Sequence, residues 1–194
     1  MNGKMPGVTL IADWQPKPGF KLGAKDIEGR QTYLGSQVWR NPRLEIREYD
    51  IPTPGPEQVL VEVKACGICG SDVHMAQADE AGYIFYPGLT GFPSILGHEF
   101  SGVVVEAGKN AINKRTNRPF QGGEPVTSEE MLWCGQCKPC ADGQPNHCER
   151  LDEIGFNVNG AYTKYILLPS RTIWSLEPLR QNYTEDDIFL AGSL

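Results

Sequence analysis

Long apolar runs are absent from this chain of 194 residues. No window approaches the roughly 18 consecutive apolar residues that a membrane-spanning helix requires. The N-terminal segment (MNGKMPGVTLIADWQPKPGF) also has no basic stretch followed by a sustained apolar one, which is the pattern of a secretory signal. We therefore expect no membrane partner and a cytoplasmic location, where the six cysteines stay reduced and available to bind metal.

A basic stripe is missing as well. The formal net charge is −6 and the Lys and Arg residues are scattered, so we expect no nucleic-acid partner. The sequence has no internal repeat, no low-complexity segment and no G-x-G-x-x-G turn of a nucleotide-binding domain. With 40% hydrophobic and 22% charged residues, its composition is that of one globular domain, with or without an appended lobe.

β-type patterns dominate the first 170 residues. In Gln58–Ala65 (QVLVEVKA) apolar side chains alternate with charged ones, which predicts a half-buried strand. The runs 100–106 (FSGVVVE) and 161–168 (AYTKYILL) predict two more strands, and 22 glycines and 15 prolines supply turns between them. A helix is predicted only at the end, where Thr184 is a suitable N-cap followed by three acidic residues. We expect a mainly β fold.

Four cysteines lie within 15 residues, at Cys134, Cys137, Cys140 and Cys148, with the spacing C-x2-C-x2-C-x7-C. So short a segment can bring four thiolates to one tetrahedral ion, and closed structural zinc sites use this ligand set. The bacterial iron–sulfur run is C-x2-C-x2-C-x3-C-P, whereas here the last spacing is seven and Glu149 follows. Disulfides would have to pair close neighbours within a tight loop. We predict a structural zinc site.

A second candidate group is spread over two segments. The first predicted strand leads into Cys69, Ser71 and His74, and the next strand opens with His98 and Glu99. Cys, His and Glu side chains are zinc ligands, and three protein ligands with one open position are typical of catalytic zinc. Taken alone, a cysteine is more often a small buried hydrophobe and a histidine more often a hydrogen-bonded structural residue. The catalytic interpretation therefore depends on the combination.

In combination, these patterns resemble a known family. C-G-S-D-V-H at residues 69–74, G-H-E at 97–99 and the four-cysteine cluster occur in the order found in the zinc-dependent medium-chain dehydrogenases, the alcohol and polyol dehydrogenase group. The resemblance covers about residues 42–194. It implies a GroES-like, mainly β barrel as the catalytic domain, with a structural-zinc lobe, in a parent enzyme whose α/β Rossmann domain binds NAD or NADP.

Within this family, the chain is most similar to the polyol branch. The insert MAQADEAGYIFYPGLTGFPSILGHEFSGVVVEAG and the segment EEMLWCGQCKPCADGQPNHC carry a closer likeness to an enzyme of inositol metabolism. The resemblance implies an oxidoreductase that oxidises a secondary hydroxyl of a polyol or cyclitol by hydride transfer to NAD. The alternatives are a zinc dehydrogenase of a simple alcohol, an amino-acid-derived alcohol or a sugar, and a zinc-binding module without catalysis. Zinc-free quinone reductases of the same fold lack the ligands present here.

The family's functional residues map onto matching positions. Cys69, His98 and Glu99 would hold a catalytic zinc, Ser71 would accept the substrate hydroxyl proton, and His74 would pass it to solvent through the cofactor ribose. The four clustered cysteines would bind a second, structural zinc. The chemistry agrees, because zinc lowers the pKa of a bound alcohol and an imidazole titrates near neutral pH. The structural alternatives are a helix N-cap for Ser71 and a solvated surface position for His74.

Two features depart from the family pattern. The family commonly has Gly-Asp-x-Val before its zinc lobe, whereas here Glu124 replaces the Asp, so the hydrogen bond of that residue must be made differently. The segment Trp14–Arg40 looks like an insertion, and we prefer a surface excursion to a substrate lid or a subunit contact. An aromatic stretch between the two halves of the second group would line a substrate cleft or fill a core: Tyr83, Phe85, Tyr86 and Phe92.

The expected organisation has two parts. Residues 1–41 form an N-terminal extension and first strand region, and residues 42–194 form the GroES-like catalytic domain, with residues 123–150 as the zinc lobe. The nucleotide-binding domain is absent and the last helix has barely begun at Leu194, so we expect a truncated front part of a longer, homo-oligomeric enzyme. Such a part would bind zinc without completing a hydride transfer. His147 is expected to be a solvated loop residue, and Cys66 a packed thiol at a strand end.

Overall fold

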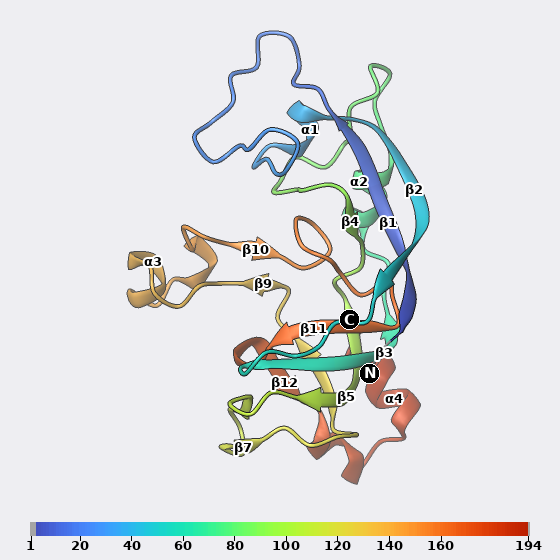
Figure 1. Ribbon diagram of the computed structural model, residues 1–194, viewed down its shortest axis with the longest axis vertical. Coiled ribbons are helices and arrows are strands. Elements are labelled where there is room, and N and C mark those ends of the chain that lie inside the picture. The colour runs from blue at the N-terminus through green and yellow to red at the C-terminus, as the bar shows by residue number, and fades with distance from the viewer. Residues whose placement is uncertain (1–2, 194) are drawn as a thin grey trace.

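The computed structural model describes residues 3–193, so residues 1, 2 and 194, at the ends of the two predicted parts, lie outside the described residues. Strands outweigh helices in the described part, which confirms the mainly β prediction (Figure 1). The larger sheet is antiparallel, with five strands in the order β11-β3-β5-β8-β12 among residues 3–193. Its strands are β3 (Gln58–Cys66), β5 (Phe100–Ala107), β8 (Pro125–Ser128), β11 (Tyr165–Pro169) and β12 (Ile173–Ser175).

Two of the three predicted strands are confirmed nearly to the residue, as β3 and β5. The third, predicted over 161–168, begins only at Tyr165. The residues before it bond elsewhere, because the N–H groups of Ala161 and Tyr162 donate to the carbonyls of Gly97 and Leu96 at 2.8 and 2.9 Å. The segment that precedes β11 is therefore tied to the segment that precedes β5.

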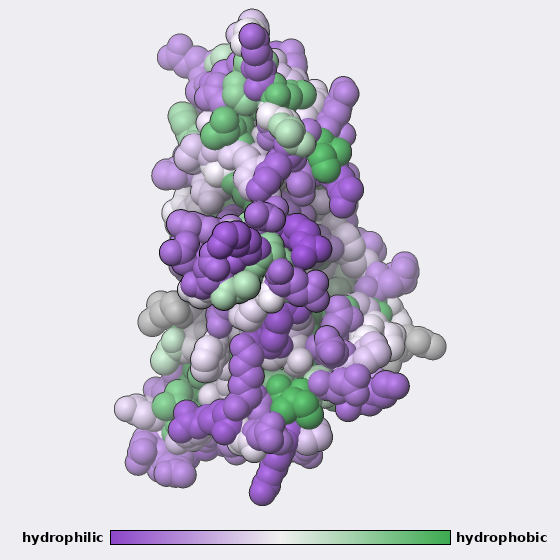
Figure 2. Space-filling model, turned by 90° about the vertical axis from the view of Figure 1, so that its left-hand side faces the viewer, coloured by the Kyte–Doolittle hydropathy of each residue, from purple (hydrophilic) through white to green (hydrophobic). Residues whose placement is uncertain are grey.

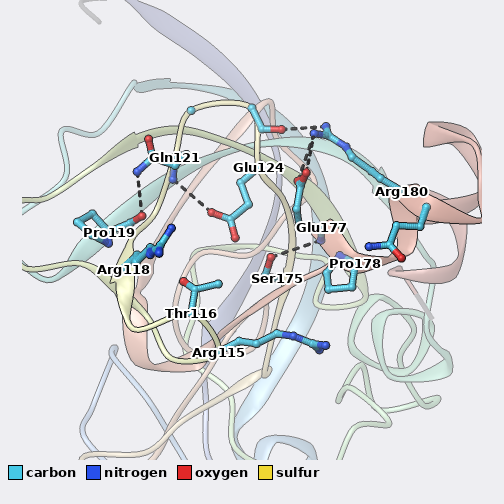
Figure 3. Close-up of a pocket in the computed structure, with 13 residues that line it drawn as sticks. Arg115, Thr116, Arg118, Pro119, Gln121, Glu124, Ser175, Glu177, Pro178 and Arg180 are labelled. Atoms are coloured by element: carbon cyan, nitrogen blue, oxygen red, sulfur yellow. Dashed lines mark hydrogen bonds and ion pairs between the residues drawn. The ribbon is translucent and has the colours of Figure 1, made fainter.

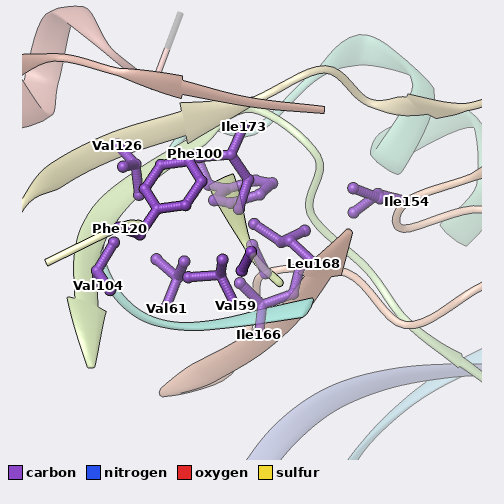
Figure 4. Packing of buried hydrophobic residues seen from close by; sticks show 12 residues of the cluster. Val59, Val61, Phe100, Val104, Phe120, Val126, Ile154, Ile166, Leu168 and Ile173 are labelled. Atoms are coloured by element: carbon purple, nitrogen blue, oxygen red, sulfur yellow. The ribbon is translucent and has the colours of Figure 1, made fainter. Parts of the chain in front are cut away.

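The core of this sheet is formed by side chains that point to one face (Figure 4). Phe100 and Phe120 pack against Val61, Val104 and other aliphatic side chains, and each of these four is at most 5% exposed. Burying a side chain of this size contributes roughly 1.5–3 kcal/mol, so this cluster holds β3 and β5 together. Because β3 ends at Cys66 and β5 begins at Phe100, the same packing sets the relative position of the residues beside these strand ends.

A second sheet is formed by β1 (Lys4–Trp14), β2 (Trp39–Asp50) and β4 (Ser94–Ile95), in the order β2-β1-β4. It covers a separate core cluster that contains Leu10, Trp39, Met75 and Phe156. The predicted Trp14–Arg40 insertion starts in β1 and ends in β2, and between them it carries α1 (Gly35–Val38). The N–H groups of Thr32 and Thr90 donate to each other's carbonyls at 2.8 and 2.9 Å, which anchors the insertion to the body of the protein.

The remaining elements are short. Thr184 caps the last helix by accepting a hydrogen bond from the Asp187 N–H at 3.3 Å, which confirms the predicted helix start. The helix ends at Ala191 with Gly192 as its C-cap, so the expectation that it has barely begun at Leu194 is wrong. None of the helices in residues 3–193 has the length and apolar character to cross a membrane. The helices are α2 (Gly70–Ala76), α3 (Lys138–Ala141), α4 (Glu185–Ala191), η1 (Pro145–His147), η2 (Ser170–Thr172) and η3 (Glu177–Gln181), and the short strands are β6 (Ile112–Asn113), β7 (Arg118–Pro119), β9 (Met131–Leu132) and β10 (Asp152–Glu153).

Candidate functional site

Cys69 lies at the N-cap position of α2, three residues after β3 ends. Its backbone is extended (φ −82°, ψ 155°) and its N–H donates to the Asp72 carboxylate at 3.0 Å. An acid in the first turn is favoured by the helix dipole, so this arrangement stabilises both the helix start and the turn that carries Cys69. Ser71 lies inside the helix, which makes its interpretation as the N-cap wrong.

His98 and Glu99 follow a glycine at a position that only glycine suits. Gly97 has φ +90°, and a Cβ atom there would lie 2.6 Å from the Tyr162 ring. The Glu99 carbonyl accepts the Gly67 N–H at 2.7 Å, so the turn before Cys69 is bonded directly to the segment that bears the other two residues. The register of β3 on β5, with Cys66 opposite Phe100, continues into this contact.

The structure brings Cys69, His98 and Glu99 together, with one potential ligand atom from each lying within 4.8 Å of the others. Ligand atoms around a tetrahedral zinc ion are separated by roughly 3.3–3.8 Å, given zinc–ligand bonds of about 2.0–2.3 Å. A thiol, an imidazole and a carboxylate whose ligand atoms lie within 4.8 Å of one another form a donor set that suits zinc, and three protein ligands would leave a fourth position open. The Ser71 hydroxyl lies 3.3 Å from His98 Nε2. His74, one turn further along α2, is exposed.

Buried polar atoms behind His98 support the same assignment. Asp72 is 4% exposed, and its Oδ1 atom faces His98 Nδ1 across 3.7 Å. Neither atom has a hydrogen-bond partner among residues 3–193. A zinc-bound histidine usually donates its second ring N–H to a carboxylate, and His98 is oriented to do so when Nε2 holds a metal. The residues therefore fit a zinc ion, and their role as ligands stays a prediction.

The four clustered cysteines also converge. The Cys137 Sγ atom lies 3.4 Å from Cys140 Sγ and 3.8 Å from Cys148 Sγ, while sulfurs around one zinc ion lie roughly 3.8 Å apart. The N–H groups of Gln136 and Cys137 point at Cys134 Sγ from 3.4 Å and lower the pKa of that thiol to about 6. Thiolates are the zinc-binding form of cysteine, so this loop is suited to a closed site with four sulfur ligands.

A network of hydrogen bonds holds the base of the zinc lobe against the larger sheet. The Glu129 carboxylate accepts the indole N–H groups of Trp133 and Trp174 at 2.9 and 3.0 Å. Arg171 donates twice to the Trp133 carbonyl, at 3.2 and 2.9 Å. From this base, the loop with α3 projects from the body in Figure 1, and in Figure 2, where it faces the viewer, its surface is mostly hydrophilic. The position of Cys134 is thus set beside a fixed tryptophan.

The four residues of the predicted aromatic stretch differ in burial. Tyr83 and Phe92 are at most 5% exposed and belong to the core, whereas Phe85 is 49% exposed and Tyr86 is half-buried. Phe156 connects this stretch to the site, because its ring centre lies 4.6 Å from that of His98 and 5.1 Å from that of Tyr86. A ring packed against His98 restricts the orientation of the imidazole.

Two other sequence-based expectations are confirmed. Cys66 ends β3 and packs against the first core cluster, and burial raises the pKa of its thiol to about 12. His147 is exposed in η1. The substitution at Glu124 is accommodated locally, because its carboxylate accepts Asn113 Nδ2 at 2.5 Å and the Gln121 N–H at 3.2 Å.

Several residues near the site were not predicted from the sequence. Asp72 had a local signal, because an acid three residues after Cys69 has the spacing of a capping box. Phe156 and Tyr162 had none, since their partners lie far away in sequence. The Tyr162 hydroxyl is 2.9 Å from Asp72 Oδ2 although the two residues are 90 positions apart. Burial and the neighbouring Asp72 raise the pKa of the Tyr162 phenol, so the hydroxyl stays a hydrogen-bond donor.

A groove of about 1080 Å³ lies apart from both clusters (Figure 3). It is lined by the β6–β7 turn and by η3, and it contains no residue of either candidate metal site. Arg180, the basic residue from η3, already bonds to Glu177, to Glu185 and to the Gly123 carbonyl. The chemistry of the ligand clusters therefore points to the functional site more strongly than the size of this groove does.

Glu130 is a half-buried carboxyl that follows β8. Burial, together with the nearby Glu153, raises its pKa from 4.5 to about 7. In the unfolded chain Glu130 ionises near pH 4.5, whereas the folded protein keeps the proton until about pH 7. Glu130 therefore lowers stability progressively above pH 4.5, and the loss is complete above about pH 7.

We predict that Glu130→Gln raises the free energy of unfolding at pH 8 and has little effect near pH 4.5. The rise in the pKa of Glu130 from 4.5 to about 7 corresponds to a loss of about 3 kcal/mol at most in the free energy of unfolding. Because the carboxyl is partly exposed to solvent, we expect a loss of roughly 1–2 kcal/mol. Urea unfolding of the zinc-loaded protein at pH 4.5, 6 and 8 measures the effect. The exposed Glu57→Gln is the matched control, and equal stabilities of wild type and Glu130→Gln at pH 8 would contradict the prediction.

Comparison with known proteins finds dehydrogenases that are similar to this chain. The profile of the alcohol dehydrogenase GroES-like domain matches residues 55–178. The chain is 62% identical over 193 residues to scyllo-inosose 3-dehydrogenase of Thermotoga maritima, covering 98% of this chain and 48% of that protein. It is 35% identical over 137 residues to L-threonine 3-dehydrogenase of Xanthomonas oryzae pv. oryzae, covering 70% and 37%. The chain thus spans about half the length, or less, of these curated relatives.

Solved structures of dehydrogenases are similar to this chain as well. An alcohol dehydrogenase structure from Thermotoga maritima superposes with a TM-score of 0.91 at 61% identity, over 97% of this chain and 48% of that one. A zinc-binding dehydrogenase from Sinorhizobium meliloti, solved with NADP, superposes with a TM-score of 0.59 at 27% identity, over 89% and 38%. The predicted GroES-like fold and the closer likeness to an enzyme of inositol metabolism are both confirmed.

Proposed function

Because this chain belongs to the alcohol dehydrogenase family with a GroES-like domain, we propose that it is the zinc-binding catalytic part of an enzyme that oxidises a secondary hydroxyl of a polyol or cyclitol with NAD. The proximity of Cys69, His98 and Glu99 to one another, with the Ser71 hydroxyl 3.3 Å from His98 Nε2, carries this proposal. The likeness to scyllo-inosose 3-dehydrogenase supports a cyclitol as the substrate class.

In this proposal each residue has a distinct task. A zinc ion held by Cys69, His98 and Glu99 would supply a Lewis acid that lowers the pKa of a substrate hydroxyl. The Ser71 hydroxyl, 3.3 Å from His98 Nε2, would accept the substrate hydroxyl proton and release its own proton in the same step. His74, exposed on α2, passes the proton to solvent. A nicotinamide would supply the hydride acceptor, and the four-cysteine site would hold a structural zinc ion.

The experiment is a substrate panel with the full-length protein, NAD or NADP, and zinc. Formation of reduced nicotinamide is measured with cyclitols, linear polyols, a simple alcohol and L-threonine. We expect turnover with a cyclitol and NAD, and little with L-threonine. Turnover of L-threonine alone would favour the alternative of an amino-acid-derived alcohol, for which the 35% identical relative is the supporting observation. Zinc binding without turnover of any alcohol would favour the non-catalytic module.

A further inference from the structure

Tyr162 is placed where three segments of the chain meet. Its N–H donates to the Leu96 carbonyl at 2.9 Å, and its own carbonyl accepts the Val8 N–H at 3.0 Å. The backbone of Tyr162 is therefore fixed between β1 and the segment that leads to His98. Neither bond involves the Tyr162 side chain, which is free to bridge to a third segment.

The Tyr162 side chain reaches the turn that carries Cys69. Its ring packs against Gly97, where an added Cβ would approach a ring atom to 2.6 Å. Its hydroxyl lies 2.9 Å from the Gly67 carbonyl and 2.9 Å from Asp72 Oδ2. One hydroxyl proton is shared between these two acceptors, and the carboxylate is the stronger one. Tyr162 thus contacts the residue before His98 and two residues that flank Cys69.

Through Asp72, these contacts restrain two predicted ligands, Cys69 and His98. Its Oδ2 atom accepts from the Cys69 N–H at 3.0 Å as well as from Tyr162, so two donors fix the carboxylate. Its Oδ1 atom is left facing His98 Nδ1, and both of these buried atoms lack a partner among residues 3–193. Without the Tyr162 hydroxyl, a single N–H would hold the carboxylate.

We propose that Tyr162 is a positioning residue for the Cys69–His98–Glu99 site, where its hydroxyl holds Asp72 in the orientation that receives His98 Nδ1–H when the imidazole binds metal. The inference rests on the proposed function, because it requires that these three residues bind zinc. Groups that orient metal ligands typically affect metal affinity by about 10–100-fold. The Tyr162 hydroxyl acts through Asp72, so its effect depends on that carboxylate.

The test uses Tyr162→Phe, which removes the hydroxyl and keeps the ring against Gly97. Zinc affinity is measured by competition with a chromophoric chelator, and the Cys69→Ser variant identifies which of the two zinc ions belongs to this site. We expect Tyr162→Phe to weaken that ion by about 10–100-fold and to leave the four-cysteine ion unchanged. The d–d absorption of Co²⁺ loaded into this site should shift, because the histidine ligand is no longer held in one orientation.

Two further variants separate positioning from general stability. Tyr165→Phe, the same change in a buried tyrosine of β11, should alter neither zinc affinity nor the Co²⁺ spectrum. Asp72→Asn should weaken the same ion, and adding Tyr162→Phe to it should weaken it little further, because the two residues act in series. Unchanged affinity in Tyr162→Phe, additive effects in the double variant, or equal weakening of both ions would overturn the inference. If wild type binds only the four-cysteine ion, the proposed function fails, and the inference with it.

Discussion

Replacing Cys137 by serine is expected to release one zinc ion per chain and to unfold residues 133–150. In this stretch Cys137 and Cys148 are the buried residues, and the remainder is exposed or half-buried. A loop with so few buried side chains has little hydrophobic stabilisation of its own. Structural zinc contributes about 10–16 kcal/mol of apparent binding energy in isolated zinc-finger peptides, and that energy is also the folding energy. Loss of one sulfur ligand should therefore cost most of the local stability.

Zinc content by mass spectrometry and hydrogen exchange of peptides from 133–150 measure this outcome. We expect fast exchange throughout the loop and unchanged protection in β3 and β5, which have their own core. Cys66→Ser is the matched control, because Cys66 is a packed thiol outside both clusters and its loss should release no zinc. A loop that stays protected after it has lost zinc would show that other contacts hold it, above all the Glu129–Trp133 bond.

The Cys69→Ser variant is expected to lose the other zinc ion and to keep its fold. Serine is a favourable N-cap residue, and Cys69 occupies the N-cap of α2, so the helix start should tolerate the change. Lewis-acid stabilisation by a metal is worth several kcal/mol, which corresponds to a rate loss on the order of 10³-fold or more. Alcohol oxidation by the full-length protein should fall by at least this factor.

The reciprocal variant makes this prediction specific. Cys148→Ser should release the four-cysteine ion and leave the ion at Cys69 in place. Metal content, unfolding midpoint and turnover are measured for both variants side by side. An ion count that does not change in Cys69→Ser would remove the support for a catalytic site at Cys69, His98 and Glu99. Turnover that survives the loss of that ion would remove zinc from the proposed mechanism.

Local sequence patterns predicted several of the strands and the last helix. The alternation in Gln58–Ala65 placed β3 because a period of two can bury only one face of a strand. Thr184 and the acids after it placed the start of α4, because N-cap bonds form between residues three apart. The strand predicted from residue 161 started late, because the N–H groups of Ala161 and Tyr162 bond to residues 97 and 96, contacts that no local pattern reveals.

The sequence by itself determined the four-cysteine cluster, whose thiols are close enough along the chain to meet within one loop. The sequence also indicated Cys69, His98 and Glu99 as candidate zinc ligands, although their proximity depends on the register of β3 against β5. Only the tertiary structure decided how these side chains are held. Asp72 faces His98 from another segment, and Tyr162 reaches Asp72 across 90 positions. Such contacts follow from how strands pair and cores pack, and both depend on the whole chain.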